Sequence, residues 1–408
     1  MDRGGSSVGK QHINIDHPLN ILRNSPHYTS DPHFRRRVDM RIAREQKFAG
    51  GRLFNLDIEI TTICNLACRT CYNVSNKPQI MTVEQFSRIL ADARQLVECL
   101  EMDGLWLTIS GGEPLTNNWI WDMLQLAQGP DIKGIAIITN GTLINQETAK
   151  LMESLGISEV MISLDGASAQ THDAIRGQGS FARTMRGVEI LIKYCSNIFL
   201  GCTMTLTTLN MDNIEDYVDL AFQMGFNYVW INPPIYCGRI VQSELDISYE
   251  EHLRIMKLVR ELDTRYFRQA FAVYYNVPYY PLTDPISPYL DLSTACPWGR
   301  TNLTITADGS VLPCLYSRDL CLGNIFEQSL IVLYHSSVLE GVRNGSLLAE
   351  PCCSCLYREF CGGCRARTYY LTEDWFAADP WCPLVRGLNE EQVRVFPSNL
   401  PKEKVGGN

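Results

Sequence analysis

Three cysteines, Cys64, Cys68 and Cys71, constrain this chain more than any other feature of its sequence. Three thiolates at this spacing can hold three irons of a four-iron cluster and leave the fourth iron open. A closed set of four cysteines would suit electron storage or structure, whereas an incomplete set lets a substrate or cofactor bind the metal directly. The motif therefore predicts a reactive iron-sulfur site that the fold has to accommodate.

Short apolar runs alternate with amphipathic stretches between Arg52 and Arg268, which is the pattern of strand and helix units around a parallel sheet. Helices are predicted to begin near Thr82, Asn117, Gln146, Phe181, Asn213 and Tyr249. The strands are predicted over residues 56–61, 105–110, 134–139, 159–164, 199–205 and 228–232. Six such units favour an α/β fold with a partial (β/α)6 barrel of the TIM type. In such barrels the loops after the strands carry the chemistry, and the three cysteines directly follow the first strand.

Composition limits the compartment and the partners. The N-terminus has no apolar signal segment and the chain has no apolar run long enough to span a membrane, so a cytoplasmic protein is expected. Sixteen cysteines in that reducing compartment are better interpreted as metal ligands than as disulfides. The net charge of -9 argues against a nucleic-acid partner.

Nine of the sixteen cysteines fall between Cys296 and Cys382, which indicates a second, cysteine-rich region and a boundary near Asp291. A Pro- and Tyr-rich connector precedes it, and its tyrosines Tyr274, Tyr275, Tyr279 and Tyr280 either line a cleft or pack on the barrel. The first fifty residues carry Arg35, Arg36, Arg37, Arg41 and Arg44, and a solvated extension is expected there. The predicted divisions are an extension (1–51), a barrel (52–270), a connector (271–295), a small C-terminal cysteine-rich domain (296–385) and a tail (386–408).

A second motif, Ser110-Gly111-Gly112-Glu113-Pro114, follows the second predicted strand. Together with Cys64, Cys68 and Cys71 it resembles the radical S-adenosylmethionine enzymes. The resemblance implies that Glu113 and the backbone beside Gly111 and Gly112 hold the methionine amino group. It also implies that one electron from the cluster cleaves the sulfonium to give a 5'-deoxyadenosyl radical, which takes a hydrogen atom from the substrate.

Further cofactor contacts are expected at the later strand ends. Asn140 after the third strand, and Ser163 with Asp165 at the end of the fourth, resemble family positions near the ribose and the methionine carboxylate. For Asp165 an ordinary turn is an equally good interpretation. Arg176 is either a further carboxylate partner or a residue that pins a loop to the rim of the barrel.

The cysteine-rich region resembles the SPASM extension, which carries auxiliary iron-sulfur clusters. Cys296 and Cys314 flank a predicted hairpin that turns at Asp308-Gly309. The resemblance implies one [4Fe-4S] cluster on Cys352, Cys355, Cys361 and Cys382, and another on Cys296, Cys314 and Cys364, the latter with an open iron or with Cys321 as its fourth ligand. A single tetrahedral zinc ion on Cys352, Cys355, Cys361 and Cys364 is the alternative.

The other cysteines carry weaker signals. Cys99, Cys195 and Cys202 lie in predicted helices or strands and are expected to be buried small hydrophobes. Cys237 follows the sixth strand, where a thiol could return a hydrogen atom to a substrate radical, although structural packing is the simpler interpretation.

Three functions stay open at this point. We expect modification of a ribosomally made precursor peptide by crosslinking, epimerisation or oxidation, with S-adenosylmethionine and a flavodoxin- or ferredoxin-type reductant as partners. The alternative enzyme is a dehydrogenase or decarboxylase of a small molecule such as a sugar, an aminocyclitol or a tetrapyrrole. The non-enzyme alternative, an electron carrier or zinc-stabilised scaffold, leaves the Gly111-Gly112-Glu113-Pro114 motif without a purpose.

Overall fold

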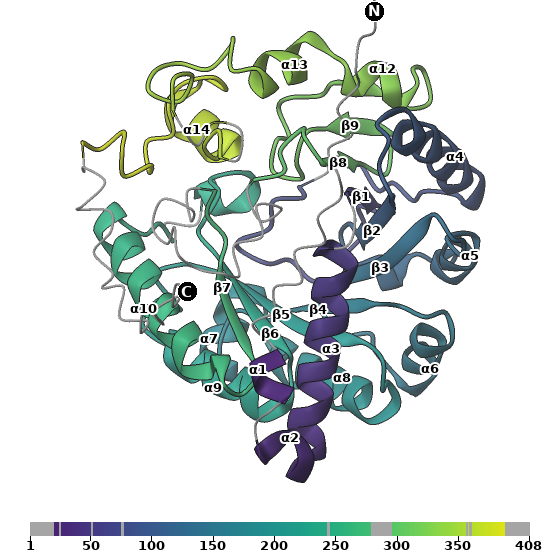
Figure 1. The fold of residues 1–408 in the computed structure, drawn as a ribbon, viewed down its shortest axis with the longest axis vertical. Helices are drawn as coiled ribbons and strands as arrows, with labels where there is room; N and C mark the ends of the chain where they lie inside the picture. Colours follow the sequence, from purple (N-terminus) through teal and green to yellow (C-terminus); the bar gives the residue numbers. More distant parts are fainter. Residues whose placement is uncertain are drawn as a thin grey trace, which may run out of the picture.

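A single twisted sheet organises the computed structural model of the chain, which describes residues 20–23, 26–49, 52–74, 77–242, 245–278, 296–355, 358 and 361–387 (Figure 1). The sheet has ten strands in the order β10-β9-β8-β1-β2-β3-β4-β5-β6-β7. All neighbours from β8 through β1 to β7 are parallel, and β9 pairs antiparallel with both β8 and β10. The strands are β1 (Leu53–Glu59), β2 (Gly104–Ser110), β3 (Ile132–Thr139), β4 (Glu159–Ser163), β5 (Phe199–Thr205), β6 (Tyr228–Asn232), β7 (Ala272–Tyr275), β8 (Asn302–Ile305), β9 (Ser310–Leu312) and β10 (Gly323–Asn324).

Helices connect the parallel strands and form the outer layer of an open barrel (Figure 1). Several begin at capping boxes, in which Thr82, Asn145 and Ser248 accept from a backbone N–H of the first turn while a side chain three residues later returns a bond. The helices of this layer are α4 (Val83–Cys99), α5 (Ile120–Leu126), α6 (Gln146–Ser154), α7 (Ala169–Arg176), α8 (Ser180–Tyr194), α9 (Ile214–Met224) and α10 (Tyr249–Phe267).

The predicted partial barrel is confirmed, and the sheet extends beyond it on both sides. All six expected strands are present, and the expected hairpin is formed by β8 and β9. Two pairings were not expected. Tyr274 and Tyr275, assigned to the connector, lie in β7 beside β6, and Leu303 of the cysteine-rich region pairs with Leu56 of β1. The cysteine-rich segment therefore contributes strands to the barrel sheet itself.

Side chains alternate along β1, so that one face of the strand is apolar and packs in the outer layer of the barrel, while the other face is polar and lies in its interior. Phe54, Leu56 and Ile58 are fully buried in the main hydrophobic core. On the opposite face, Asp57 accepts a hydrogen bond from Thr304 of β8 at 3.3 Å, and burial raises the pKa of Asp57 to about 6. Glu59, at the end of the same face, brings this polar side to the loops after the strands.

The N-terminal helices correct the expectation of a solvated extension. They are α1 (Asn20–Arg23), α2 (Pro26–Ser30) and α3 (Pro32–Ala49), and α3 crosses the barrel near the start of β5 (Figure 1). Val38 and Ile42 of α3 are buried against Ala270. Arg36 donates to the carbonyls of Cys195 and Ser196, both at 3.1 Å, and Arg37 donates to that of Gln269 at 3.2 Å. These arginines attach α3 to the barrel because they satisfy carbonyls at the ends of its helices.

The remaining helices, α12 (Leu330–Tyr334), α13 (Ser337–Arg343) and α14 (Arg365–Thr372), belong to the cysteine-rich region. None of the cysteines forms a disulfide. Cys195 and Cys202 are buried as expected, but the expectation was wrong for Cys99, which is exposed at the end of α4.

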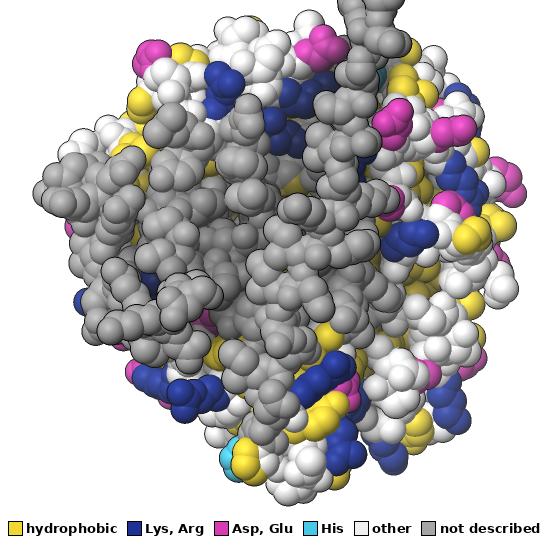
Figure 2. Space-filling model, in the orientation of Figure 1, with side chains coloured by type: hydrophobic (Ala, Val, Ile, Leu, Met, Phe, Trp, Pro, Cys, Tyr) yellow, Lys and Arg dark blue, Asp and Glu magenta, His cyan; other side chains and the backbone are white. Residues whose placement is uncertain are grey.

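No helix of the described segments has the length and apolar character needed to cross a membrane. On the face shown in Figure 2, Lys and Arg side chains are interspersed with Asp and Glu. The predicted boundary at Asp291, Tyr279, Tyr280 and tail residues 388–408 lie outside the described residues.

Candidate functional site

The loop after β1 carries all three cysteines of the first motif. Cys64 Sγ accepts from the backbone N–H of Leu66 at 3.4 Å, and the backbone N–H of Cys71 donates to the Cys68 carbonyl at 3.3 Å. Burial raises the pKa of Cys64 to about 11. The loop has no regular secondary structure of its own, so its shape depends on contacts from the neighbouring strand ends.

The glycine-rich motif after β2 pairs with the backbone directly before Cys64. Gly112 donates to the Thr61 carbonyl at 2.7 Å, and Glu113 donates to that of Ile63 at 2.8 Å. A Cβ at Gly111 or Gly112 would lie 2.3 Å from the Thr61 or Ile63 carbonyl oxygen, respectively. Both positions therefore require glycine because the two loops approach so closely. An ammonium is only a donor, so the groups that the motif can offer it are backbone carbonyl oxygens and the Glu113 carboxylate.

Glu113 is fully buried and connects three loops. Its carboxylate accepts from the Thr139 hydroxyl at 2.7 Å, the Asn140 N–H at 2.8 Å and the Leu115 N–H at 3.1 Å. Burial raises its pKa while these bonds oppose the rise. Glu113 thus sets the relative position of the β2 and β3 loops, and its role toward a methionine ammonium stays a prediction.

Asn140 lies beside the cysteine loop. Its Nδ2 donates to Asn65 Oδ1 at 2.9 Å and lies 4.0 Å from Cys64 Sγ, while its Oδ1 accepts from the Thr142 hydroxyl at 2.6 Å. Ser163 is partly exposed at the end of β4, in register with Thr203 of β5.

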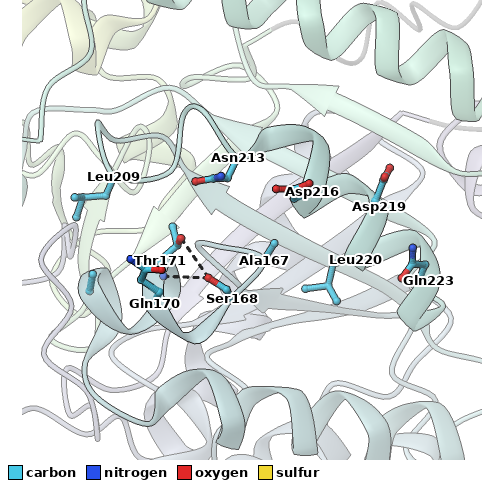
Figure 3. A pocket seen from close by; sticks show the side chains of 11 residues that line it. Ala167, Ser168, Gln170, Thr171, Leu209, Asn213, Asp216, Asp219, Leu220 and Gln223 are labelled. Atoms are coloured by element: carbon cyan, nitrogen blue, oxygen red, sulfur yellow. Dashed lines mark hydrogen bonds between the residues drawn. The ribbon is translucent and has the colours of Figure 1, made fainter.

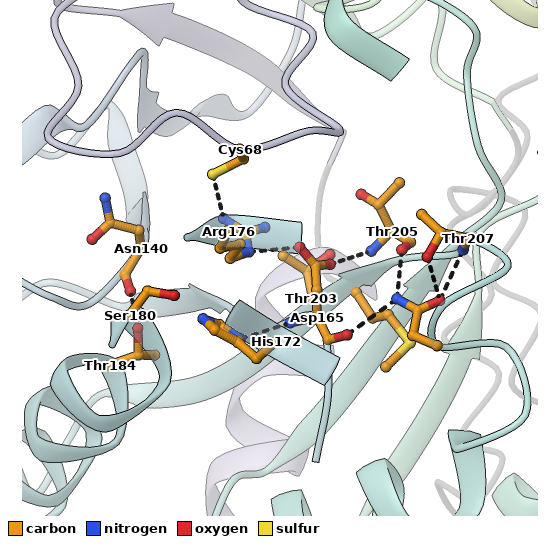
Figure 4. A network of polar contacts seen from close by, with 12 residues as sticks. Cys68, Asn140, Asp165, His172, Arg176, Ser180, Thr184, Thr203, Thr205 and Thr207 are labelled. Atoms are coloured by element: carbon orange, nitrogen blue, oxygen red, sulfur yellow. Dashed lines mark hydrogen bonds and ion pairs between the residues drawn. The ribbon is translucent and has the colours of Figure 1, made fainter. Parts of the chain in front are cut away.

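Arg176 and Asp165 form a buried ion pair next to Cys68 (Figure 4). Arg176 Nε lies 2.6 Å from Asp165 Oδ2, and Arg176 Nη1 donates to Cys68 Sγ at 3.9 Å. The other oxygen of Asp165 accepts from the Thr205 N–H at 2.8 Å. The ion pair joins the ends of β4, β5 and α7 to the cysteine loop, so Asp165 is more than a turn residue.

The loop after β6 holds the other side of the cysteine loop, and the sequence analysis did not identify it. Arg239 donates from its backbone N–H to the Cys71 carbonyl at 2.9 Å and from Nη1 to the Cys68 carbonyl at 3.1 Å. Gly238, in the 3-10 helix η2 (Gly238–Gln242), has φ of +67°, and a Cβ there would lie 2.3 Å from the Cys71 carbonyl oxygen. The sequence signal is only a Gly-Arg pair shortly after a strand.

A cavity of about 850 Å³ opens between the cysteine loop and the cysteine-rich region. Its wall includes Glu59, Tyr72, Cys237, Arg318, Cys321 and Tyr370. Arg318 donates from Nη1 to Glu59 Oε2 at 2.9 Å, makes a second bond to Oε1, and places its guanidinium carbon 4.9 Å from the centre of the Tyr72 ring. The volume of the cavity is typical of ligand sites.

Two of the predicted cysteines line this cavity. Burial raises the pKa of Cys237 to about 12, so this thiol retains its hydrogen at neutral pH. Cys321 is exposed and donates to the Gly323 carbonyl at 3.3 Å. The wall position fits the hydrogen-donor hypothesis for Cys237, which stays a prediction, as does ligation by Cys321.

The seven remaining cysteines lie in two neighbouring groups. Burial raises the pKa of Cys314, and nearby Cys296 and Cys364 add to the rise. In the second group, burial raises the pKa of Cys382 to about 11, with a further contribution from Cys352. The first group is Cys296, Cys314 and Cys364, and the second is Cys352, Cys355, Cys361 and Cys382, with Cys361 also near Cys296. The allocation of these cysteines to two clusters stays a prediction.

The sulfur environments fit iron-sulfur ligation. The backbone N–H two residues further on donates to the sulfur at Cys64 (3.4 Å) and Cys361 (3.3 Å), and the same contact occurs at Cys296 and Cys314. Hydrogen bonds to the sulfurs are a principal means by which proteins set cluster potentials. In the described part of the chain, no three His, Cys, Asp or Glu side chains converge to hold one metal ion.

A second cavity, of about 710 Å³, lies away from these groups between α7 and α9 (Figure 3). Ser168, Thr171, Asp216 and Asp219 are among its lining residues, and none of the predicted site residues lines it. It is therefore not part of the candidate site.

Comparisons with known proteins agree with both cysteine regions. The sequence profile of the Radical SAM superfamily matches residues 58–223, and that of the SPASM iron-sulfur cluster-binding domain matches residues 296–364. The chain is 27% identical to an AdoMet-dependent heme synthase of Methanosarcina barkeri over 79% of this chain and 94% of that protein. It is 28% identical to a PqqA peptide cyclase of Streptomyces rochei over 80% of this chain and 88% of that protein.

Among solved structures, the fold resembles Streptococcus suis SuiB bound to its precursor peptide SuiA. The TM-score is 0.65 at 18% identity, over 85% of this chain and 79% of that one. This likeness concerns the fold alone.

Proposed function

Since this chain is a radical S-adenosylmethionine enzyme with a SPASM extension, we propose that it modifies a ribosomally made precursor peptide. Cys64, Cys68 and Cys71 would hold a [4Fe-4S] cluster, which would supply the electron for reductive cleavage of S-adenosylmethionine and so the radical chemistry that removes a hydrogen atom from the substrate. The cysteine loop, the Gly111-Gly112-Glu113 backbone and the ends of β3 and β4 contact one another and would hold these groups in this proposal.

The observation that carries the proposal is the cavity of about 850 Å³ between the two cysteine regions. Tyr72 in its wall directly follows Cys71, and Arg318 lies four residues after Cys314. A substrate side chain in the cavity would therefore lie next to both the radical source and an auxiliary cluster. Val74 and Val241, which are 50% and 62% exposed, add apolar surface to the wall for the rest of a peptide.

The chain's own residues have defined tasks in this scheme. The Glu59–Arg318 ion pair fixes this part of the cavity wall, because each side chain neutralises the charge of the other. Cys237 holds a hydrogen on its sulfur at the wall and could return it to a substrate radical. The resemblance to a PqqA peptide cyclase supports a peptide as the substrate.

Some further parts of the proposal rest on the sequence. We propose that the auxiliary clusters and the reaction belong to the cytoplasm, where thiols stay reduced, and that a flavodoxin- or ferredoxin-type protein supplies the electron. The divisions 1–51, 52–270, 271–295, 296–385 and 386–408 are proposed with it, and the two family matches fall inside the second and fourth of them.

A tetrapyrrole is the second candidate substrate, because the chain matches an AdoMet-dependent heme synthase over 94% of that protein. Oxidative decarboxylation of a tetrapyrrole side chain would use the same radical source. It would need the auxiliary clusters to accept the substrate electron.

One experiment separates the two. Anaerobically reconstituted enzyme is incubated with dithionite and S-adenosylmethionine, first with the precursor peptides encoded near its gene and then with carboxylated tetrapyrroles, and products are measured by mass spectrometry. A peptide product, or deuterium transfer from a labelled peptide into 5'-deoxyadenosine, supports the proposal. Loss of carbon dioxide from the tetrapyrrole with no change in any peptide would overturn it. Cys68→Ala should abolish all products.

A further inference from the structure

Arg365 is a buried cation, and only one of its three guanidinium nitrogens has a hydrogen-bond partner among the described residues. It begins α14 directly after Cys364, and its side chain is 1% exposed. Nη1 donates to the carbonyls of Trp375 at 3.0 Å and Ala377 at 2.7 Å. Nε and Nη2 are buried and have no hydrogen-bond partner among the residues that the structure describes.

The neighbouring Arg367 shows what a satisfied buried guanidinium looks like in this region. Arg367 is equally buried, but Asp379 neutralises it through bonds of 2.5 and 3.2 Å. The remaining contacts of Asp379 go to the backbone N–H groups of Cys364 and Trp381, at 2.9 and 3.0 Å. This carboxylate is therefore committed to Arg367 and to the backbone. A buried charge without a counter-charge is strongly unfavourable, so Arg365 calls for a different anionic group.

The unmet nitrogens lie among the candidate cluster ligands. A Cβ at Gly363, between Cys361 and Cys364, would lie 2.4 Å from Arg365 Nη2, so this side chain is pressed against the backbone of the ligand segment. Burial raises the pKa values of Cys296, Cys352 and Cys364, and the charge of Arg365 opposes the rise at all three. Cys296 and Cys364 belong to one cysteine group and Cys352 to the other. Arg365 therefore lies close enough to both cysteine groups for its positive charge to act on each of them.

We propose that Arg365 compensates the negative charge of the auxiliary iron-sulfur site, with Nε and Nη2 as hydrogen-bond donors to its sulfurs, and that it raises the reduction potential of this site. A thiolate-ligated cluster is anionic and presents several sulfur acceptors, which matches one cation with two unpartnered nitrogens. A nearby positive charge and donors to sulfur both stabilise the reduced, more negative cluster. The inference rests on the proposed function, since it needs the SPASM cysteines to hold a cluster.

The test compares Arg365→Gln with Arg343→Gln in the full chain. Arg343 is a matched control, because it also donates to two carbonyls, those of Gly299 at 2.8 Å and Tyr334 at 2.7 Å, and no contact with a candidate ligand is found for it among the described residues. Both variants and the wild type are reconstituted anaerobically. Iron and sulfide are then quantified, and the auxiliary clusters are titrated by potential with electron paramagnetic resonance as the readout.

We expect wild type and Arg343→Gln to hold about twelve irons, four for each of three clusters. Arg365→Gln should either lose about four of them or keep them at a lower potential. At a fixed potential the oxidised-to-reduced ratio should rise at least tenfold, which for a one-electron couple is about 59 mV. Arg365→Lys keeps the charge but not the paired donors, so its reduction potential should lie between those of the wild type and Arg365→Gln. This variant serves as the test if Arg365→Gln does not fold.

The outcomes separate this inference from the proposed function. Twelve irons with unchanged potential in both Arg365 variants would overturn the role of Arg365 and leave the function standing. A wild type that takes up only about four irons would remove the auxiliary clusters from the proposed function, and this inference with them.

Discussion

Replacing Asp165 by Asn should destabilise the protein strongly, because it leaves the Arg176 guanidinium buried without its counter-charge. The two side chains are 0% and 13% exposed, and their atoms lie 2.6 Å apart. Removing one partner of such a buried pair costs about 3–5 kcal/mol. Asn has nearly the same shape and can still accept from the Thr205 N–H through Oδ1, so the loss reports mainly on the charge.

The measurement is the free energy of unfolding of metal-free protein in urea, with circular dichroism as the readout. The matched control is Asp212→Asn, which breaks the exposed pair with Arg254, whose side chains are 71% and 51% exposed. That change should cost no more than about 1 kcal/mol. The double variant Asp165→Asn with Arg176→Met removes both charges. Its free energy of unfolding should fall by less than that of Asp165→Asn alone.

Two results would refute this reasoning. One is a loss for Asp165→Asn no larger than that for Asp212→Asn, and the other is a double variant that loses the sum of the single effects. Since Arg176 Nη1 also donates to Cys68 Sγ at 3.9 Å, iron uptake by the Cys64–Cys68–Cys71 site of the folded Asp165→Asn protein should fall as well.

Three further predictions follow from contacts around the site and the barrel. Gly112→Ala places a Cβ 2.3 Å from the Ile63 carbonyl oxygen, so it should lower the iron bound by the Cys64–Cys68–Cys71 site while the auxiliary iron is kept. Iron analysis and spectroscopy measure both amounts, and an unchanged iron content of the Cys64–Cys68–Cys71 site would contradict the prediction. Arg239→Gln removes the side-chain bond to the Cys68 carbonyl at 3.1 Å and should change the paramagnetic spectrum of that cluster, whereas Arg254→Gln should not. Burial raises the pKa of Asp57 from 3.8 to about 6, so the native state binds its proton more tightly and unfolding free energy should fall as pH rises from about 4 to 6. Asp57→Asn should remove about 3 kcal/mol of this dependence, and identical pH profiles for wild type and variant would count against the buried carboxyl.

Local sequence patterns predicted the barrel because each unit carries its own signals. The capping residues Thr82 and Ser248 and the alternation in β1 depend on neighbours within a few residues. The pairing of β8 with β1, by contrast, joins Asn302 to Asn55 across almost 250 positions, and nothing local specifies that partner. The Tyr-rich run of β7 was assigned to a connector since the prolines that follow it dominate the pattern.

The candidate site divides in the same way. Spacing and resemblance predicted roles for the cysteines and Glu113, whose residue types are limited by chemistry, and these roles stay predictions. Arg239 was missed, because its backbone and side chain both bind carbonyls, which any chain segment offers. The contacts of Arg36 on α3 with the carbonyls of Cys195 and Ser196 were missed for the same reason. Arginine was interpreted as a surface charge, yet at several positions here it acts as a donor to otherwise unpaired carbonyls.

The cysteine loop shows why the barrel and the chemistry are inseparable in this chain. The loop is held by the glycine motif after β2, by Asn140 after β3, by Arg176 of α7 and by Arg239 after β6. These four elements meet only because parallel strands bring their carboxyl ends to one edge. None of the four contacts is specific to iron. They fix the carbonyls and side chains of the loop and thereby position its three sulfurs. A change at any of the four should therefore affect the first cluster while it spares the auxiliary site, which rests on α14 and its own cysteines.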